Sequence, residues 1–264
     1  MHDFTYHRPT SLADAAKALG GASEAKIIAG GMTLVPTMKQ RLASPSDLID
    51  LAGIAELKGI KLEGNTVTIG AMTTHAEVAD SADVKKAIPA LAALAEGIGD
   101  PQVRHRGTIG GSISNNDPAA DYPAAILGLD ATIVTNKRKI KADDFFKGMF
   151  ETALAGDEIV ISVSFPKPEK AGYAKFPNPA SRYAMVGVMV AKTAGGVRVA
   201  VTGAGPSVFR QKDMEKALSG SFSADALKGV TVDSNGLNSD IHGAADYRAH
   251  LVGVMAGRAV AAAK

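Results

Sequence analysis

Apolar residues recur along the chain with two different spacings, and the two spacings alternate from segment to segment. Where they return every third or fourth position, they predict helices at residues 11–21, 32–43, 73–80, 88–98, 121–129 and 246–264. Short runs that are apolar throughout or at every second position predict strands at residues 25–31, 59–70, 130–135, 158–166 and 183–202. Because strands and helices alternate, the pattern predicts an α+β or mixed α/β fold.

Local signals indicate where several of these elements begin or turn. Ser11 is a predicted N-cap, and Thr74 and Glu77 have the spacing of a capping box. Thr33 is expected to cap the helix at 32–43. Hairpin turns are predicted at two pairs, Gly64-Asn65 and Gly195-Gly196.

The division into domains is predicted from length and from a proline-rich stretch. A chain of 264 residues exceeds the roughly 250 residues at which single cores stop growing. Four prolines between residues 166 and 180 suggest a connection between subdomains. We therefore expect a first domain at 1–166, made of subdomains at about 1–57 and 58–166, and a C-terminal domain at 167–264.

Composition and charge exclude several classes of protein. The hydrophobic share of 46% and charged share of 21% are those of an ordered globular chain. A net charge of +2, with dispersed cationic residues, does not favour nucleic acid. No signal core or membrane span is apparent, so a cytoplasmic location is expected.

The absence of cysteine is the most decisive feature of the composition. It excludes disulfides, cysteine nucleophiles, thiolate zinc sites and any iron–sulfur cluster held by this chain. The six histidines have no metal-ligand spacing and are interpreted as surface or capped residues, so no metal site is predicted.

Two glycine pairs predict a binding site. Gly30-Gly31 lies between a predicted strand and helix, where positive φ values would turn backbone N–H groups toward an oxyanion. Gly110-Gly111, flanked by Thr108 and Ser112, could form a second such nest. Two nests suit a diphosphate. The alternative is that each pair only makes a tight turn.

Other nucleotide motifs do not account for the sequence. No P-loop pattern is present. Gly203 and Gly205 follow a strand as in a dinucleotide-binding fingerprint, but Val208 occupies the third glycine position and Pro206 interrupts the turn. A Rossmann site is therefore not predicted there.

Four motifs occur in order along almost the whole chain: AGGMT at 29–33, QVRHRGTIGGS at 102–112, DPAADYPA at 117–124 and SDIHGAADYRAHL at 239–251. Together they resemble the FAD-binding subunit of the molybdenum hydroxylases, a family that includes aerobic carbon monoxide dehydrogenase and xanthine dehydrogenase. The resemblance implies an α+β architecture, with a two-subdomain FAD-binding fold of the vanillyl-alcohol oxidase type. A small antiparallel sheet with helices would follow at the C-terminus.

The resemblance also implies which residues contact FAD. Asp121 would hydrogen-bond the ribityl region, although a role as helix N-cap is an alternative. Val160 would meet the flavin ring through its backbone, Lys175 would approach it from the C-terminal domain, and Tyr183 would lie beside it unless it is a core tyrosine. The two FAD loops would comprise Ile28, Ala29, Gly30, Gly31, Met32, Thr33 and Leu34, and Thr108, Ile109, Gly110, Gly111 and Ser112.

In that family, substrate is oxidised at a molybdenum cofactor on a large subunit, and electrons pass through two [2Fe–2S] clusters on a small subunit to FAD. The resemblance implies noncovalent FAD on this chain, and large and small partner subunits in a dimer of heterotrimers. The electron acceptor would be NAD, a quinone or dioxygen. Two alternatives stay open: a self-contained FAD-dependent reductase or oxidase of the same fold, and a non-catalytic scaffold.

Overall fold

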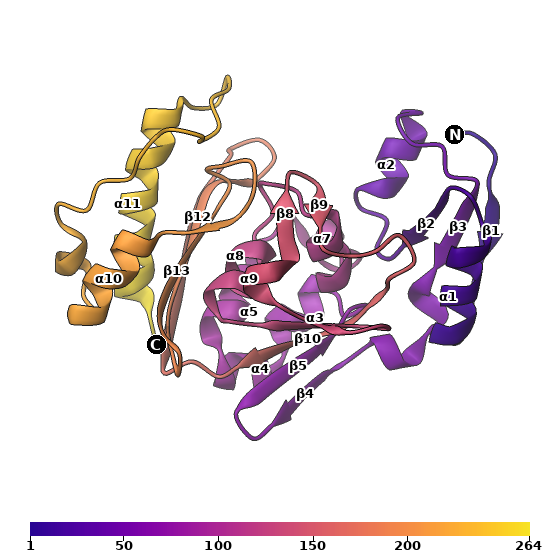
Figure 1. Ribbon diagram of the computed structural model, residues 1–264, viewed down its shortest axis with the longest axis horizontal. Coiled ribbons are helices and arrows are strands. Elements are labelled where there is room, and N and C mark those ends of the chain that lie inside the picture. The colour runs from indigo at the N-terminus through magenta and orange to yellow at the C-terminus, as the bar shows by residue number, and fades with distance from the viewer.

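Three separate sheets and a short two-stranded hairpin organise the chain, and the computed structural model describes all of its residues, 1–264. A three-stranded sheet forms the N-terminal unit, a five-stranded sheet the middle unit, and a four-stranded sheet the C-terminal unit. The first and last units lie at opposite ends of the molecule (Figure 1). The fold thus agrees with the predicted α+β class.

The N-terminal unit is a small parallel sheet in the order β1-β3-β2. Ser11 caps α1, as predicted, by accepting a hydrogen bond from the Asp14 amide. Thr33 occupies the N-cap position of α2 but makes no side-chain capping bond, and α2 is shorter than predicted. The elements are β1 (Thr5–His7), α1 (Leu12–Gly21), β2 (Ala25–Ile28), α2 (Leu34–Lys39), β3 (Asp47–Asp50) and the 3-10 turns η1 (Leu51–Gly53) and η2 (Ala55–Leu57).

The middle unit has the strand order β4-β5-β10-β6-β7. The predicted turn at Gly64-Asn65 joins β4 to β5, and Gly64 adopts a φ of +57°. Thr74 and Glu77 form both bonds of the predicted capping box. The elements are β4 (Ile60–Glu63), β5 (Thr66–Gly70), α3 (His75–Asp80), α4 (Ala82–Ala87), α5 (Pro89–Glu96), α6 (Pro101–Arg104), α7 (Ile109–Asn115), α8 (Tyr122–Gly128), β6 (Thr132–Thr135), β7 (Lys139–Lys141), α9 (Ala142–Phe145), β8 (Phe146–Gly148), β9 (Glu151–Thr152) and β10 (Val160–Pro166).

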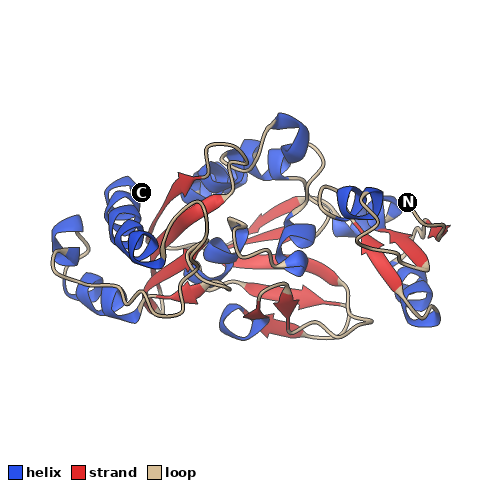
Figure 2. Ribbon diagram, turned by 90° about the horizontal axis from the view of Figure 1, so that it is seen from above, coloured by secondary structure: helices blue, strands red, loops and turns tan.

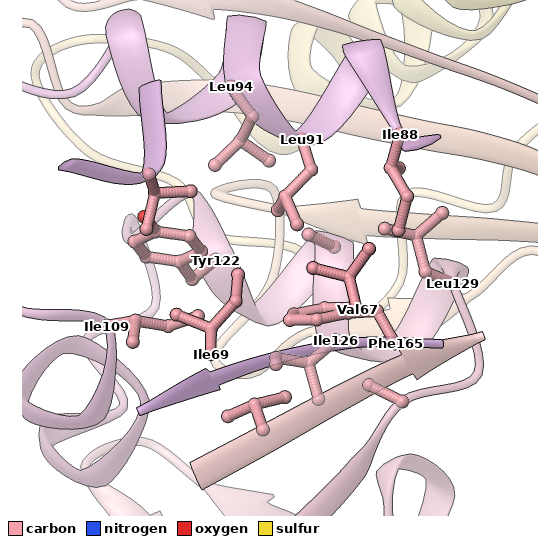
Figure 3. Close-up of a cluster of buried hydrophobic side chains, with 14 of the residues drawn as sticks. Val67, Ile69, Ile88, Leu91, Leu94, Ile109, Tyr122, Ile126, Leu129 and Phe165 are labelled. Atoms are coloured by element: carbon pink, nitrogen blue, oxygen red, sulfur yellow. The ribbon is translucent and has the colours of Figure 1, made fainter. Parts of the chain in front are cut away.

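The largest core lies between this sheet and its helices. Val67 and Ile69 of β5 meet Leu91 and Leu94 of α5, and Tyr122 of α8 is buried beside them (Figure 3). Burying each large aliphatic side chain contributes about 1.5–3 kcal/mol, so this core fixes α3, α5, α7 and α8 on the sheet. The starts of α7 and α8 are thereby held in place.

The C-terminal unit is an antiparallel sheet in the order β11-β12-β13-β14 with helices on its outer side (Figure 2). The predicted connection at 166–180 is wrong for most of its length, because residues 170–177 form β11. Its prolines lie before the strand, at its last residue or after it, where a missing N–H breaks no central ladder. The elements are β11 (Lys170–Pro177), β12 (Ala184–Thr193), β13 (Gly196–Thr202), β14 (Phe209–Arg210), α10 (Lys212–Gly220), η3 (Ala224–Leu227) and α11 (Ala245–Ala262).

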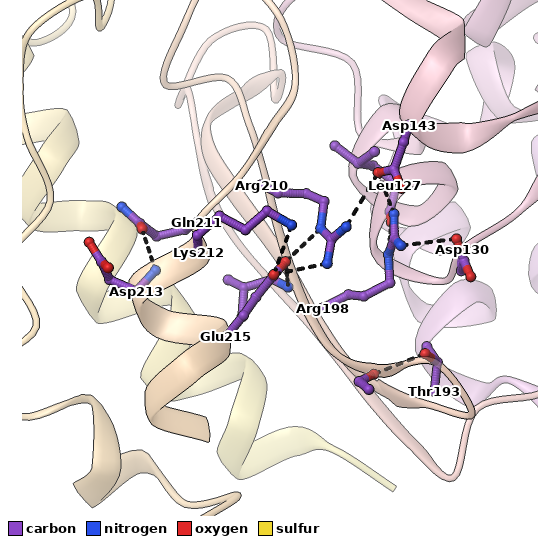
Figure 4. Close-up of polar contacts among 12 residues, drawn as sticks. Leu127, Asp130, Asp143, Thr193, Arg198, Arg210, Gln211, Lys212, Asp213 and Glu215 are labelled. Atoms are coloured by element: carbon purple, nitrogen blue, oxygen red, sulfur yellow. Dashed lines mark hydrogen bonds and ion pairs between the residues drawn. The ribbon is translucent and has the colours of Figure 1, made fainter. Parts of the chain in front are cut away.

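Ion pairs of the buried Arg198 side chain join the C-terminal sheet to the middle unit (Figure 4). The Arg198 guanidinium on β13 donates to the Leu127 carbonyl at 2.7 Å and pairs with Asp143 at 2.6 Å and Asp130 at 3.0 Å. Arg210 also pairs with Asp143 at 3.5 Å, and it is held in place by Glu215 of the C-terminal unit at 2.6 Å. These contacts hold β12 and β13 against α8. The loop before β12 is held beside the middle unit, because the Ala184 amide donates to the Ala119 carbonyl at 3.2 Å.

None of the helices combines the length and the apolar composition that a bilayer crossing requires.

Candidate functional site

A cavity of about 790 Å³ lies where the N-terminal unit, the middle unit and the loop before β12 meet. This volume is within the range of small-molecule and cofactor sites. Three predicted site residues, Ile28, Ile109 and Lys175, are not part of its wall. The predicted residues that do line it are Ala29, Gly30, Gly31, Met32, Thr33, Leu34, Thr108, Gly110, Gly111, Ser112, Asp121, Val160 and Tyr183.

The first glycine loop has the free donors expected of an anion site. The backbone N–H groups of residues 30–34 donate no hydrogen bond within the protein, and all five residues line the cavity. Gly31 has a φ of +74°, which glycine adopts without strain. Any side chain at Gly30 would clash with the Arg106 carbonyl oxygen. The loop between β2 and α2 can therefore accept an oxyanion through backbone groups alone.

The prediction of a second nest at Gly110-Gly111 is wrong. Both glycines lie inside α7 without positive φ, and their N–H groups already donate to the Ala71 carbonyl at 2.9 Å and to Thr108 Oγ1 at 3.1 Å. Gly110 is required by packing, because an added Cβ would lie 2.6 Å from the Ala71 Cβ. What α7 presents to the cavity is the unpartnered hydroxyl groups of Ser112 and Ser114.

Asp121 reaches the cavity wall from the start of α8, but it does not cap that helix. Its buried carboxylate accepts hydrogen bonds from the Tyr173 hydroxyl at 2.5 Å and from Lys175 Nζ at 2.9 Å. Lys175 also donates to the Gly97 carbonyl at 3.0 Å, so it contacts Asp121 behind the wall. Burial raises the pKa of the Asp121 carboxyl, whereas the Lys175 charge and the Tyr173 hydrogen bond lower it.

Tyr183 is part of the cavity wall and is 47% exposed, so it is not a core tyrosine. It ends a tight loop in which Asn178 Oδ1 accepts hydrogen bonds from the amides of Ala180 at 2.9 Å and Ser181 at 3.1 Å. The Asn178 amide donates to the Tyr183 carbonyl at 2.8 Å. These hydrogen bonds fix the loop, which places the Tyr183 ring beside the cavity, where it can cover a planar ligand.

Two cavity-wall residues whose pKa values are strongly lowered, His75 and Glu158, were not predicted from the sequence. The expectation that the histidines are surface or capped residues is wrong for His75. His75 is buried, and burial together with the nearby Arg104 lowers its pKa to about 4. Glu158 accepts hydrogen bonds from Arg138 Nε at 3.0 Å and from Thr135, which lower its pKa to about 2. No local pattern marks either residue, because their partners are distant in sequence.

A family model for the FAD binding domain in molybdopterin dehydrogenase matches residues 2–168 of the chain. The chain belongs to this family. FAD is accordingly its cofactor. The free backbone amides of residues 30–34 can contact a diphosphate, and the cavity volume of about 790 Å³ is within the range of cofactor sites.

Relatives match over nearly the whole length of the chain. It is 39% identical to the nicotine 6-hydroxylase medium subunit of Paenarthrobacter nicotinovorans, over 94% of this chain and 92% of that one. It is 36% identical to the carbon monoxide dehydrogenase medium chain of Hydrogenophaga pseudoflava, over 98% and 96%. These relatives are subunits of oxidoreductases.

Solved structures show the same fold. Reconstituted carbon monoxide dehydrogenase from Oligotropha carboxidovorans superposes with a TM-score of 0.91 at 33% identity, covering 98% of this chain and 97% of that one. Quinoline 2-oxidoreductase from Pseudomonas putida 86 superposes with a TM-score of 0.88 at 28% identity, covering 98% and 96%. The predicted FAD-binding fold with a C-terminal antiparallel sheet is thus confirmed, and the chain is a medium-type FAD subunit of this oxidoreductase family.

Proposed function

We propose that this chain is the electron-transfer subunit of a molybdenum-containing hydroxylase or dehydrogenase. Electrons reach it from [2Fe–2S] clusters on a small subunit, which receives them from a molybdenum cofactor on a large subunit, and leave for an external acceptor. The observation that carries the proposal is the run of free amides at residues 30–34 on a large cavity, in a chain with no cysteine to hold a cluster.

Different residues of the cavity hold different parts of the cofactor. The amides of residues 30–34 bind the diphosphate, and the hydroxyl groups of Ser112 and Ser114 supply further donors. Tyr183 covers the ring system, and Asp121 contacts the ligand from the start of α8. Bound FAD supplies the conversion between one-electron and two-electron transfer.

The other residues that were predicted to contact FAD have different roles in the proposed site. Val160 begins β10 in the cavity wall, where its backbone is available to the ligand. Lys175 acts on the site through Asp121, whose ionised carboxylate it stabilises at 2.9 Å. Ile28 lies between the cavity-wall residues Ile27 and Ala29, and Ile109 lies between Thr108 and Gly110, so each holds its segment in place without lining the cavity.

The assembly proposed is a dimer of heterotrimers, with this chain beside the small and large subunits. Support comes from its relatives, which are named as medium chains and cover nearly all of it. A self-contained flavin reductase or oxidase is the competing proposal. No observation in the cavity favours it. Of the acidic groups there, Asp121 and Glu158 are paired with cations. Asp100 and Asp117 accept hydrogen bonds from the backbone amides of Val103 and Ala119.

Anaerobic absorbance at the flavin maximum tests the proposal. Carbon monoxide, purines, aldehydes and N-heterocycles are added to the FAD-loaded chain alone, and to the chain reconstituted with its large and small subunits. The proposal expects one of these substrates to bleach the flavin in the complex and none to bleach the lone chain. Bleaching of the lone chain would refute the proposal and favour the self-contained enzyme.

A further inference from the structure

Two buried polar atoms next to the cavity have no hydrogen-bond partner, Nδ1 of His75 and the hydroxyl oxygen of Tyr122. His75 is 5% exposed and Tyr122 is fully buried, and their ring centroids lie 5.3 Å apart. The Tyr122 ring lies at one side of the apolar core, with its hydroxyl pointing away from Ile126 and Phe165 (Figure 3). Because buried polar groups are almost always paired, these two atoms indicate partners from outside the chain.

The backbone fixes His75 in the cavity wall. It is the first residue of α3, and its amide donates to the Gly107 carbonyl at 3.0 Å. An added Cβ at Gly107 would lie 2.6 Å from His75 Nε2, so the Nε2 edge of the ring rests on Gly107. His75 and Gly107 both line the cavity, whereas Nδ1 is on the buried side. The ring therefore has one nitrogen toward the protein interior and the other toward the ligand side.

The charge of the ring follows from its surroundings, and the partner of Nδ1 sets its tautomer. Burial and Arg104 lower the pKa of His75 to about 4, so the ring is neutral at neutral pH. A neutral imidazole has one N–H donor and one acceptor nitrogen. A single buried water that accepts from the Tyr122 hydroxyl and donates to Nδ1 would satisfy both unpaired atoms. The ring hydrogen is then on Nε2, at the cavity wall.

Contacts along the cavity wall connect His75 to the loop of Tyr183. Arg182, the residue before Tyr183, donates to the Gly99 carbonyl at 3.4 Å. An added Cβ at Gly99 would lie 3.0 Å from Val103, and one at Gly107, beside His75, would lie 3.1 Å from the Val103 carbonyl oxygen. Tyr183 is the sole phenyl-type side chain of the cavity wall, so a planar ring system fits beside it. The flavin ring has carbonyl oxygens and ring nitrogens that accept hydrogen bonds.

We propose that His75 is a flavin-binding residue, which donates a hydrogen bond from Nε2–H of its neutral ring to an acceptor atom of the flavin ring system. One buried water joins its Nδ1 to the Tyr122 hydroxyl and fixes this tautomer. The inference rests on the proposed flavin site, and it adds a residue that neither glycine loop contains.

Nitrogen-15 NMR of the full chain labelled at histidine tests the tautomer directly. The His75 signals, assigned by their loss in His75→Gln, should report a neutral ring with hydrogen on Nε2 at pH 7, and they should shift when FAD is added. A Tyr122→Phe variant should move the Nδ1 signal. A hydrogen on Nδ1, or His75 signals that are the same with and without FAD, would overturn the proposal.

Titration with FAD measures the contribution of the contact. His75→Phe should weaken FAD binding about tenfold, the equivalent of one lost hydrogen bond, and should shift the flavin absorption maximum and reduction potential. His75→Gln, which keeps a donor, should retain most of the affinity. The control is His105→Gln, because His105 is exposed and bonded through Nδ1 to the Pro101 carbonyl at 2.7 Å.

The outcomes separate this inference from the function on which it rests. A wild-type chain that binds no FAD would refute the flavin site itself. A wild-type chain that binds FAD, together with a His75→Phe variant of equal affinity, spectrum and potential, would refute the role of His75 alone.

Discussion

The buried pair of Asp121 and Lys175 leads to a prediction that can be worked out from the structure. Their side chains are 4% and 10% exposed, and Nζ lies 2.9 Å from Oδ2. Lys175→Met keeps the aliphatic stem but removes the charge, which leaves the Asp121 carboxylate with the Tyr173 hydroxyl as its remaining side-chain partner. Removing one partner of a buried ion pair costs about 3–5 kcal/mol. A domain is stable by about 5–15 kcal/mol, so the loss is a large fraction of the total.

Urea unfolding at pH 7 measures this loss, with Lys192→Met as the matched control. Lys192 pairs with Glu169 at 2.9 Å, but the two side chains are 44% and 59% exposed, so its loss should cost less than about 1 kcal/mol. A double variant, Lys175→Met with Asp121→Asn, should regain much of the stability, because it leaves no uncompensated charge.

The pH dependence of the Lys175→Met variant follows from the carboxyl group. Burial raises the pKa of Asp121, and removing the cation raises it further. The cost of keeping the group ionised is therefore greatest at neutral pH and declines as pH falls toward the unfolded-state pKa of about 4. If Lys175→Met is no more destabilising than Lys192→Met, or equally destabilising at pH 7 and pH 4.5, the reasoning is refuted.

Two further predictions concern the first loop and the acid stability. Gly31→Val should lower FAD affinity about tenfold in a fluorescence titration. A residue with a side chain pays roughly 1–2 kcal/mol for a φ of +74°, and the new Cβ would lie 3.0 Å from Val35. Gly20→Val is the control and should leave the affinity unchanged, because there is open space around Gly20. Glu158, whose pKa is lowered from 4.5 to about 2 chiefly by Arg138, should contribute stability that is complete above pH 4.5 and lost as pH falls toward 2. Acid unfolding followed by circular dichroism should show that loss in the wild type and not in Glu158→Gln.

Elements governed by local signals were predictable from the sequence. The caps at Ser11 and Thr74 and the turn at Gly64 depend on residues within four positions, so their chemistry can be read along the chain. The strand at 170–177 was not predicted, because prolines precede it, end it and follow it. Its residues nevertheless form an antiparallel pairing with β12.

The candidate site was predictable where a segment acts through its own backbone. Gly31 adopts the expected positive φ, and its loop faces the cavity. Gly110 has the same sequence pattern, but glycine is required there by contact with Ala71, 39 residues earlier in the chain, and its amide already donates to the Ala71 carbonyl. No local sequence pattern marks His75 as a site residue, because Gly107 and Tyr122, which surround it, come together only in the folded chain. One-dimensional patterns do not contain such contacts.

The central claim, that the cavity holds one noncovalent FAD, is tested most directly by the flavin content of the purified full chain after loading with FAD. The chain is denatured, the polypeptide is separated by filtration, and flavin is measured in both fractions. We expect one FAD per chain in the filtrate and none on the polypeptide. Flavin that stays with the polypeptide, a different nucleotide in its place, or a chain that takes up no FAD would contradict the account.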